Sequence, residues 1–209
     1  MRGISATRLP AQNPTEANMS GSSRKKTTKK VAAAQKVAHA GRSTESAHAA
    51  SARATPTNPI PALSMAPEFA LQDDGGVLRR LSEFKGSPVV LYFYPADDTP
   101  GCTKEACNFR DDYSAYQVRG VTILGVSPDT VSSHAKFRSK YELPFALLAD
   151  PDHTVCSSYG VWGEKTFMGR TFEGVRRTTF LLDAAGRIVR VFENVKPATH
   201  SAEILAALP

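Results

Sequence analysis

Two cysteines, five residues apart, follow a short turn in the middle of the chain, and their setting predicts redox chemistry. The apolar run 89–94 predicts a β-strand, and the Pro/Asp/Gly turn after it leads into a helix with Cys102 at its start. A thiol there lies near unpaired backbone N–H groups and the positive end of the helix dipole, which both favour the reactive thiolate. We therefore expect Cys102 to attack a substrate and Cys107 to resolve the oxidised product.

A cysteine is more often a small buried residue than a nucleophile. The neighbours of Cys102 favour the role of a nucleophile over that of a core residue. Gly101 leaves the thiol with few bulky neighbours, and the junction of a strand with a helix is where α/β folds place their sites. Thr99 can direct a hydroxyl toward whatever the sulfur attacks, although a threonine in this position is often only a helix N-cap.

The spacing of the two cysteines carries a geometric consequence. In a continuous helix, residues five apart have Cα atoms about 8.6 Å from each other. A disulfide requires less than about 7 Å. If Cys107 forms a disulfide with Cys102, the first turns of the helix must unwind in every cycle. The alternative is that Cys107 is a core residue on the helix face.

The remaining pattern predicts an α/β domain with a mixed β-sheet flanked by helices, since strands and helices alternate before a final hairpin and helix. A first hairpin is expected from strands at 69–72 and 77–81, and a second from strands at 178–182 and 188–192. Between them we expect strands at 89–94, 121–126 and 145–149 and helices at about 103–118, 131–141 and 154–159, and a last helix at 201–208.

The charge of the chain is concentrated at its N-terminal end. Of 209 residues, 1–60 hold ten Lys or Arg and two Asp or Glu, a net charge of +8, and 61–209 have a net charge of −2. The first segment is poor in large apolar residues, so we expect a disordered basic tail over 1–60 and one folded domain over 61–209. A cleaved targeting segment is the alternative for the tail, and no apolar run reaches the length of a signal peptide or a membrane span.

The cysteines and histidines indicate the expected compartment of the protein and the kinds of site that are not expected in it. Three cysteines are an odd and sparse set for a secreted disulfide scaffold, so a reducing compartment is expected: the cytoplasm, or an organelle if the tail is a transit peptide. Cys156 falls in a short apolar helix and is expected to be structural. We expect no metal and no cofactor, because there is no Cys-x-x-Cys pair and the histidines lack ligand spacing. Within 61–209 these histidines are His134, His153 and His200.

Three segments resemble one known family. The run Asp98-Thr-Pro-Gly-Cys-Thr-Lys-Glu-Ala-Cys107, preceded by Tyr94-Pro95, is similar to the active-site motif of the peroxiredoxins, in particular of the Q-type branch, also called the bacterioferritin comigratory protein family. The stretches 159–165 and 174–183 resemble the same family, and the likeness runs from about residue 61 to 208. It implies a thioredoxin-like fold and a thiol-dependent peroxidase that serves antioxidant defence.

The resemblance also implies roles for individual residues. Cys102 would be oxidised by hydrogen peroxide or an organic hydroperoxide to a sulfenic acid, which Cys107 would resolve. Thr99 would bind a peroxide oxygen. By motif match Arg177 is the arginine that stabilises charge on the leaving oxygen, and Arg176 should point to the opposite face of its strand.

Three further residues of the motif complete the expected site. Pro95 and Pro100 would shape the substrate pocket and limit water. Glu105 is placed with them, and its alternative role is only to complement the N-terminus of the helix.

Expectations about partners follow from the resemblance and from the tail. The family implies a thioredoxin or similar dithiol as reductant, and often a monomer. The tail could make non-specific contact with nucleic acid, since it is basic but lacks interleaved aromatic residues. No membrane partner is expected. A thiol protease or acyl transferase would need a histidine beside Cys102, and a thioredoxin-type oxidoreductase would need Cys-x-x-Cys.

Overall fold

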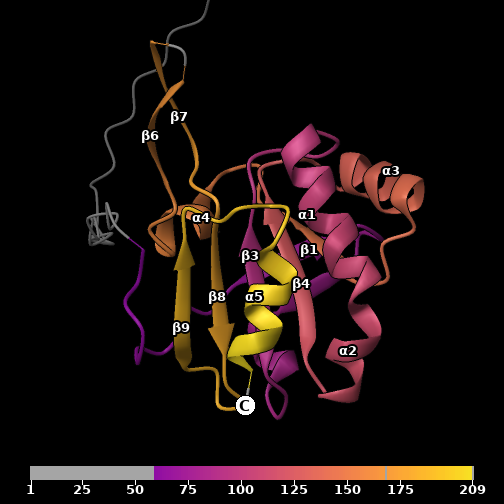
Figure 1. Ribbon diagram of the computed structural model, residues 1–209. Coiled ribbons are helices and arrows are strands. Elements are labelled where there is room, and N and C mark those ends of the chain that lie inside the picture. Colours follow the sequence, from indigo (N-terminus) through magenta and orange to yellow (C-terminus); the bar gives the residue numbers. More distant parts are fainter. Residues whose placement is uncertain (1–58, 168, 209) are drawn as a thin grey trace, which may run out of the picture. The chain divides into compact units, whose positions relative to one another are not determined.

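The computed structural model describes residues 59–167 and 169–208 (Figure 1). The predicted tail 1–60 lies outside these residues except for its last two positions. Ile60 packs against the hydrophobic core, and its backbone N–H donates to the carbonyl of Tyr159 at 3.3 Å. The described part of the chain is therefore joined to the core almost from its first residue.

A seven-stranded sheet forms the centre of the domain, in the order β2-β1-β5-β4-β3-β8-β9. The strands β3, β4 and β5 pair in parallel, and the outer strands pair antiparallel, so the predicted mixed sheet is confirmed. The bounds are β1 Ala70–Asp73, β2 Leu78–Arg80, β3 Val89–Phe93, β4 Thr122–Ser127, β5 Ala146–Ala149, β8 Thr178–Leu182 and β9 Ile188–Glu193.

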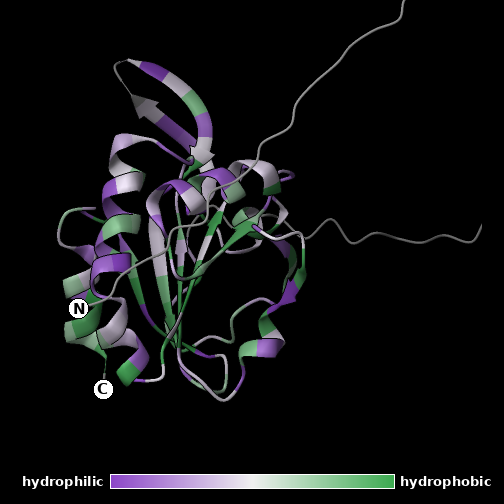
Figure 2. Cartoon of the chain, turned by 90° about the vertical axis from the view of Figure 1, so that its right-hand side faces the viewer, coloured by the Kyte–Doolittle hydropathy of each residue, from purple (hydrophilic) through white to green (hydrophobic). Residues whose placement is uncertain are grey.

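Helices cover both faces of this sheet. They are α1 Pro100–Asp111, α2 Tyr113–Val118, α3 Val131–Tyr141, α4 Thr154–Ser158 and α5 His200–Ala207, with a 3₁₀ turn, η1, at Leu81–Phe84. One hydrophobic cluster joins β3 to α4 and η1, and a second joins β3 to α1, α2, α3 and α5. All five residues of β3 are buried, as expected for a strand with both faces covered. Figure 2 shows strands that are largely hydrophobic at the centre, between helices of mixed hydropathy.

Two details differ from the sequence prediction. The expected helix 103–118 is wrong at its start and in its continuity: α1 already begins at Pro100, and a break at Asp112 separates it from α2. The apolar positions keep their helical spacing across the break, so periodicity alone does not reveal it. The hairpin of β6 (Trp162–Phe167) and β7 (Arg170–Val175) was not predicted; it stands out from the sheet in Figure 1.

The register of two central strands brings the predicted site together. Phe93, the last residue of β3, pairs with Thr178, the first residue of the antiparallel strand β8. The residues that follow β3 and those that precede β8 therefore lie at the same edge of the sheet. The loop toward Cys102 is the first of these segments, and Arg177 belongs to the second. Strand pairing thus brings the two segments that carry these side chains to the same end of the sheet.

Candidate active site

Cys102 is the third residue of α1 and is 2% exposed. The helix begins with Pro100 because a proline has a fixed φ suited to the first turn and lacks the N–H that would stay unpaired there. Thr99 is the N-cap residue in an extended conformation, and its carbonyl accepts the N–H of Thr103 at 2.8 Å. The thiol therefore lies in the first turn of the helix, as the sequence predicts.

Arg177 connects the thiol to a buried carboxylate. Its Nη2 atom donates to Sγ of Cys102 at 3.1 Å, and its Nη1 atom forms an ion pair with Oε2 of Glu105. The carboxylate side chain is 1% exposed and the guanidinium 16% exposed, so water screens this contact little. The predicted approach of Arg177 to Cys102 is present in the structure.

The electrostatics of this group follow from burial. Desolvation raises the pKa of Glu105 to about 7, although the positive charge of Arg177 opposes the shift. Burial works against the charge of Arg177, yet Glu105 and Cys102 together raise its pKa above the ordinary value. Glu105 is thus more than a complement to the helix N-terminus. The sequence did not reveal this pairing, because the two residues are 72 positions apart.

The hydroxyl of Thr99 does not cap the N-terminus of α1. The side chain makes no capping hydrogen bond, and Oγ1 instead donates to the carbonyl of Ala96 at 3.1 Å. A hydroxyl that donates one bond keeps two lone pairs that can accept a hydrogen bond. Thr99 occupies the N-cap position without acting as a side-chain cap, so its oxygen can accept a hydrogen bond from a bound ligand.

Side chains of α3 fix the loop that precedes α1. The carboxylate of Asp97 accepts bonds from the hydroxyls of Tyr94 and Ser133, both at 2.7 Å, and contacts Nδ1 of His134 at 2.9 Å. Burial raises the pKa of Asp97, but the bonds from His134 and Ser133 outweigh it and hold the pKa below the usual value. Asp97 was not singled out from the sequence, and its contacts with Ser133 and His134 could not be predicted because these two residues belong to a distant helix.

The next residue, Asp98, is held by the same helix. Its backbone has a positive φ of 54°, which is uncommon for a residue other than glycine. Its carboxylate accepts bonds from Nζ of Lys140 and the hydroxyl of Tyr141, each at 2.6 Å. These contacts stabilise the turn that directs the chain into α1.

The other two cysteines differ from Cys102 and from each other. Cys107 lies half-buried on α1, and all three cysteines are free thiols. Cys156 is fully buried in α4, as its apolar surroundings in the sequence predict. Burial, followed by the nearby negative charge of Asp150, raises the pKa of the Cys156 thiol far above its usual value. Such a thiol is a poor nucleophile.

The remaining predicted residues surround the turn. Pro95 is half-buried in the loop after β3, and Pro100 is exposed at the first position of α1. Arg176 points away from the thiol, because its Nη2 atom donates to the carbonyl of Gly160 at 2.6 Å. The structure thus separates the two neighbouring arginines, as the alternation of an extended chain predicts.

An open recess of about 350 Å³ lies beside Arg177, and Lys165, Asn194 and Val195 are among the residues that line it. Lys165 was not singled out from the sequence. It comes from β6, and its ammonium donates to the carbonyl of Val175 at 2.7 Å. Burial lowers the pKa of Lys165, the positive charge of Arg177 lowers it further, and Cys102 opposes both effects.

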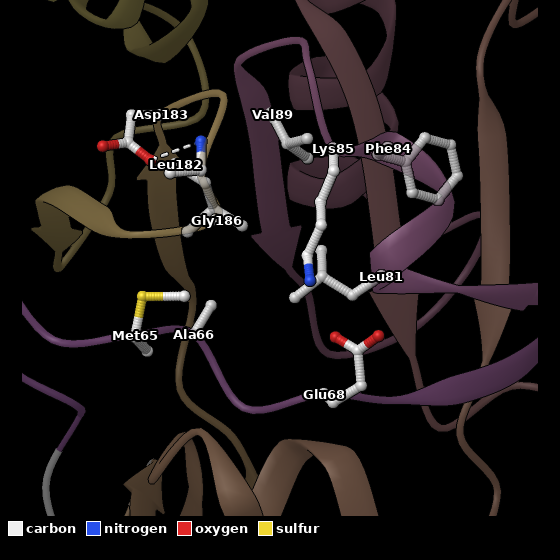
Figure 3. A pocket seen from close by; sticks show the side chains of 11 residues that line it. Met65, Ala66, Glu68, Leu81, Phe84, Lys85, Val89, Leu182, Asp183 and Gly186 are labelled. Atoms are coloured by element: carbon white, nitrogen blue, oxygen red, sulfur yellow. Dashed lines mark hydrogen bonds between the residues drawn. The ribbon is translucent and has the colours of Figure 1, made fainter.

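A second cavity lies apart from the thiol. The cavity in Figure 3 has a volume of about 50 Å³, and Leu81, Val89 and Leu182 line it. These three residues belong to the hydrophobic cluster on the α4 side of the sheet, whereas Cys102 belongs to the cluster on the α1 side. This cavity therefore has no part in chemistry at Cys102.

The described residues contain neither a candidate metal site nor a candidate membrane-spanning helix. Within 59–167 and 169–208, no group of three or more His, Cys, Asp or Glu side chains is arranged to hold a metal ion. No helix in these ranges is long and apolar enough to cross a membrane.

The geometry defines what this group can do chemically. A guanidinium that is hydrogen-bonded to sulfur is placed to interact with a nucleophile there, and its remaining N–H groups can bind an oxygen that gains negative charge. A nearby hydroxyl can accept a hydrogen bond from the O–H group of a bound hydroperoxide. These are the parts that nucleophilic attack on an O–O bond requires.

Comparisons with known proteins agree with this chemistry. The AhpC/TSA family matches residues 63–191. A putative peroxiredoxin Bcp of Coxiella burnetii is 50% identical over 143 residues, which are 68% of this chain and 95% of the relative. Peroxiredoxin Bcp of Escherichia coli is 45% identical over 148 residues, which are 71% of this chain and 95% of the relative.

Solved structures support the same assignment. The bacterioferritin comigratory protein of Xanthomonas campestris is 38% identical and superposes with a TM-score of 0.64, over 66% of this chain and 88% of that one. The predicted thioredoxin-like fold is thereby confirmed. A family match over more than half of the chain, together with these relatives, shows that the chain belongs to the AhpC/TSA family, in its Bcp or Q-type peroxiredoxin branch, and is a thiol-dependent peroxidase.

Proposed function

We propose that Cys102 is the peroxidatic thiol of this enzyme. The observation that carries the proposal is the 3.1 Å contact between Nη2 of Arg177 and Sγ of Cys102 in a nearly dry site. The thiolate attacks the terminal oxygen of a hydroperoxide, the O–O bond breaks, and the sulfur becomes a sulfenic acid. The electron pair of that bond leaves on the second oxygen, which takes up a proton to give water or an alcohol.

Arg177 and Thr99 act on the peroxide during this step. The guanidinium neutralises negative charge that moves from sulfur to the leaving oxygen, and it is already in place before the reaction. The hydroxyl oxygen of Thr99 accepts a hydrogen bond from the O–H group of the hydroperoxide and so orients the O–O bond. Glu105 keeps Arg177 in its position through the buried ion pair. Pro95 and Pro100 shape the entrance and limit the access of water.

Cys107 completes the cycle as the resolving thiol. Its sulfur attacks the sulfenic sulfur of Cys102, a disulfide forms, and the hydroxyl leaves as water with the thiol proton. Because α1 is continuous through both residues, its first turns must unwind before the sulfurs can meet. A dithiol reductant of the thioredoxin kind then returns both cysteines to thiols.

The substrates proposed are hydrogen peroxide and organic hydroperoxides. The bacterioferritin comigratory protein of Xanthomonas campestris is described as having alkyl peroxide reduction activity. We propose that this enzyme acts in the same way in a reducing compartment such as the cytoplasm, where its three thiols would stay reduced. An organelle is the alternative if residues 1–60 are a transit peptide. We also propose that the enzyme is a monomer.

Residues 1–58, which carry all the charged side chains of the predicted basic tail 1–60, lie outside the described part of the chain. Their net charge of +8 supports non-specific contact with nucleic acid. Deleting 1–60 should abolish salt-sensitive retention on DNA and leave peroxidase activity intact. Retention of the shortened protein would overturn this role for the tail.

The main proposal is tested by stopped-flow measurement of peroxide consumption in the presence of thioredoxin and its reductase. Cys102→Ser should lose activity by several orders of magnitude, as expected when a covalent nucleophile is removed. Residual activity above about a tenth of wild type would overturn the assignment. Cys107→Ser should still react once with peroxide but should fail to turn over with thioredoxin.

A further inference from the structure

The segment between β9 and α5 lies along the part of α1 that carries both cysteines. We call residues 195–198 the strap. A Cβ atom on Gly101 would lie 3.8 Å from Cγ of Pro197. Farther along the helix, the side-chain amide of Asn108 donates to the carbonyls of Pro197 and Ala198, both at 2.9 Å. Figure 1 shows this segment running from β9 to α5 beside α1.

The two residues of α1 that lie against the strap flank the two cysteines. Gly101 immediately precedes Cys102, and Asn108 immediately follows Cys107. The strap therefore passes close to the start of the stretch that has to rearrange when the disulfide forms, and it is hydrogen-bonded to the end of that stretch. Cα atoms about 8.6 Å apart must approach to less than about 7 Å, which a folded helix does not permit. Unwinding that reaches Cys107 also displaces Asn108, because the two residues are neighbours in the chain.

The hydrogen bonds between Asn108 and the strap can be replaced by hydrogen bonds to water. Ala198 is exposed and Pro197 is half-buried, so water can bind the carbonyls that Asn108 releases. The two hydrogen bonds therefore contribute a modest net stability to the folded helix, far less than a buried anchor would. A contact of this strength delays unwinding without preventing it.

We propose that Asn108 is a positioning residue of the resolving step: its amide latches the turn of Cys107 to the strap, so the strap must open before Cys107 reaches the sulfenic acid of Cys102. This inference rests on the proposed function, in which Cys107 is the resolving thiol. The latch keeps the peroxide-reactive form of the site folded while substrate is bound. It also lengthens the lifetime of the sulfenic acid, during which a second peroxide can oxidise it to sulfinic acid.

The test compares Asn108→Ala with a matched control, Arg119→Ala. Arg119 also ties a helix to α5, because its Nη1 atom donates to the carbonyl of Leu205 at 2.6 Å, but it lies far along the chain from Cys107. Reduced protein is mixed with one equivalent of hydrogen peroxide, quenched with a thiol-blocking reagent at set times, and mapped for the Cys102–Cys107 link. Loss of two hydrogen bonds should speed disulfide formation by about tenfold in Asn108→Ala. Arg119→Ala should form the disulfide at the wild-type rate.

Two further readouts separate a latch from a general loss of stability. The rate of sulfenic acid formation should be unchanged in Asn108→Ala, and the sulfinic fraction at excess peroxide should fall. In wild type, hydrogen exchange at the amides of Lys196, Ala198 and Thr199 should rise on oxidation. Equal disulfide rates in Asn108→Ala and wild type, or strap amides that do not respond to oxidation, would overturn the latch alone. Absence of any Cys102–Cys107 link in wild type would overturn the resolving role of Cys107 and the latch with it.

Discussion

Glu105 and Cys102 bind the same guanidinium group, that of Arg177, from one face of α1. Their spacing of three residues places the two acidic side chains next to each other on the helix. Arg177 reaches them from a segment more than seventy positions later in the chain. The guanidinium of Arg177 thus contacts both the carboxylate of Glu105 and the sulfur of Cys102. The expected effects of substitutions at Arg177 and Glu105 follow from these two contacts.

Thr99→Val and Arg177→Ala should slow the reaction of Cys102 with peroxide far more than its reaction with iodoacetamide. Both residues are proposed to act on the O–O bond, and an alkylating agent has no such bond to polarise. We expect losses of roughly a hundredfold with peroxide for Arg177→Ala and roughly tenfold for Thr99→Val. Stopped-flow kinetics with both reagents on the reduced variants measure the ratio.

Arg176→Ala is the control for this comparison. It removes a neighbouring positive charge whose side chain binds the carbonyl of Gly160 and not the thiol. Its rates with both reagents should stay near wild type. If Arg177→Ala slows both reagents equally, then Arg177 acts only on thiolate formation and has no role at the peroxide.

Glu105→Gln should change how the free energy of unfolding depends on pH. Burial raises the pKa of Glu105 from 4.5 to about 7 in the folded chain. Between these values the folded state binds more protons than the unfolded state, so stability from this group is full below about pH 4.5 and is lost as the pH rises through 7. A shift of this size corresponds to roughly 3 kcal/mol.

Urea unfolding of the reduced protein at several values between pH 5 and pH 8 measures this effect. The wild type should lose more stability than Glu105→Gln over that range, because glutamine has no proton to lose. Parallel curves for the two proteins would show that Glu105 does not titrate in this range.

His134→Ala should destabilise the loop before Cys102. Nδ1 of His134 lies 2.9 Å from the carboxylate of Asp97, and both side chains are almost fully buried. Removal of this partner leaves the carboxylate short of one charge-assisted hydrogen bond, which costs roughly 2–3 kcal/mol. We expect a lower melting temperature and a slower reaction of Cys102 with peroxide.

Ser133→Ala provides the milder comparison, since the hydroxyl of Ser133 donates to the same carboxylate at 2.7 Å. Its effect on the melting temperature should be smaller. A His134→Ala protein that melts like wild type would mean that Tyr94 and Ser133 alone satisfy Asp97.

Oxidation with one equivalent of peroxide should join Cys102 to Cys107 within one chain and unwind the start of α1. Local unfolding of the first turns of a helix costs little compared with global stability. Hydrogen exchange over 103–108 should rise in the oxidised form, and peptide mapping should identify the link. A bond from Cys102 to Cys156 or to a second chain would instead make Cys107 a core residue.

Local patterns in the sequence predicted most of the helices and strands of the fold. The bounds of α3 follow from its helical periodicity, and the strands β3, β4 and β5 follow from short apolar runs. The hairpin of β6 and β7 escaped because its strands are largely polar and exposed, with little apolar alternation to mark them. The division of α1 from α2 at Asp112 is a local change in backbone geometry without a change of apolar period.

The chemistry of the site divides in the same way. The residues from Thr99 to Cys107 are contiguous in the chain, so the sequence by itself predicted Cys102 as the nucleophile. It also determined the place of Cys102 at the start of a helix and the excess distance between the two cysteines in that helix. The pairing of Glu105 with Arg177 was decided only by the tertiary structure. So were the contact of His134 with Asp97 and the hold of Asn108 on the strap. The physical reason is that each of these contacts joins segments 37 to 89 residues apart, which only the register of the sheet and the packing of helices upon it bring within a hydrogen bond.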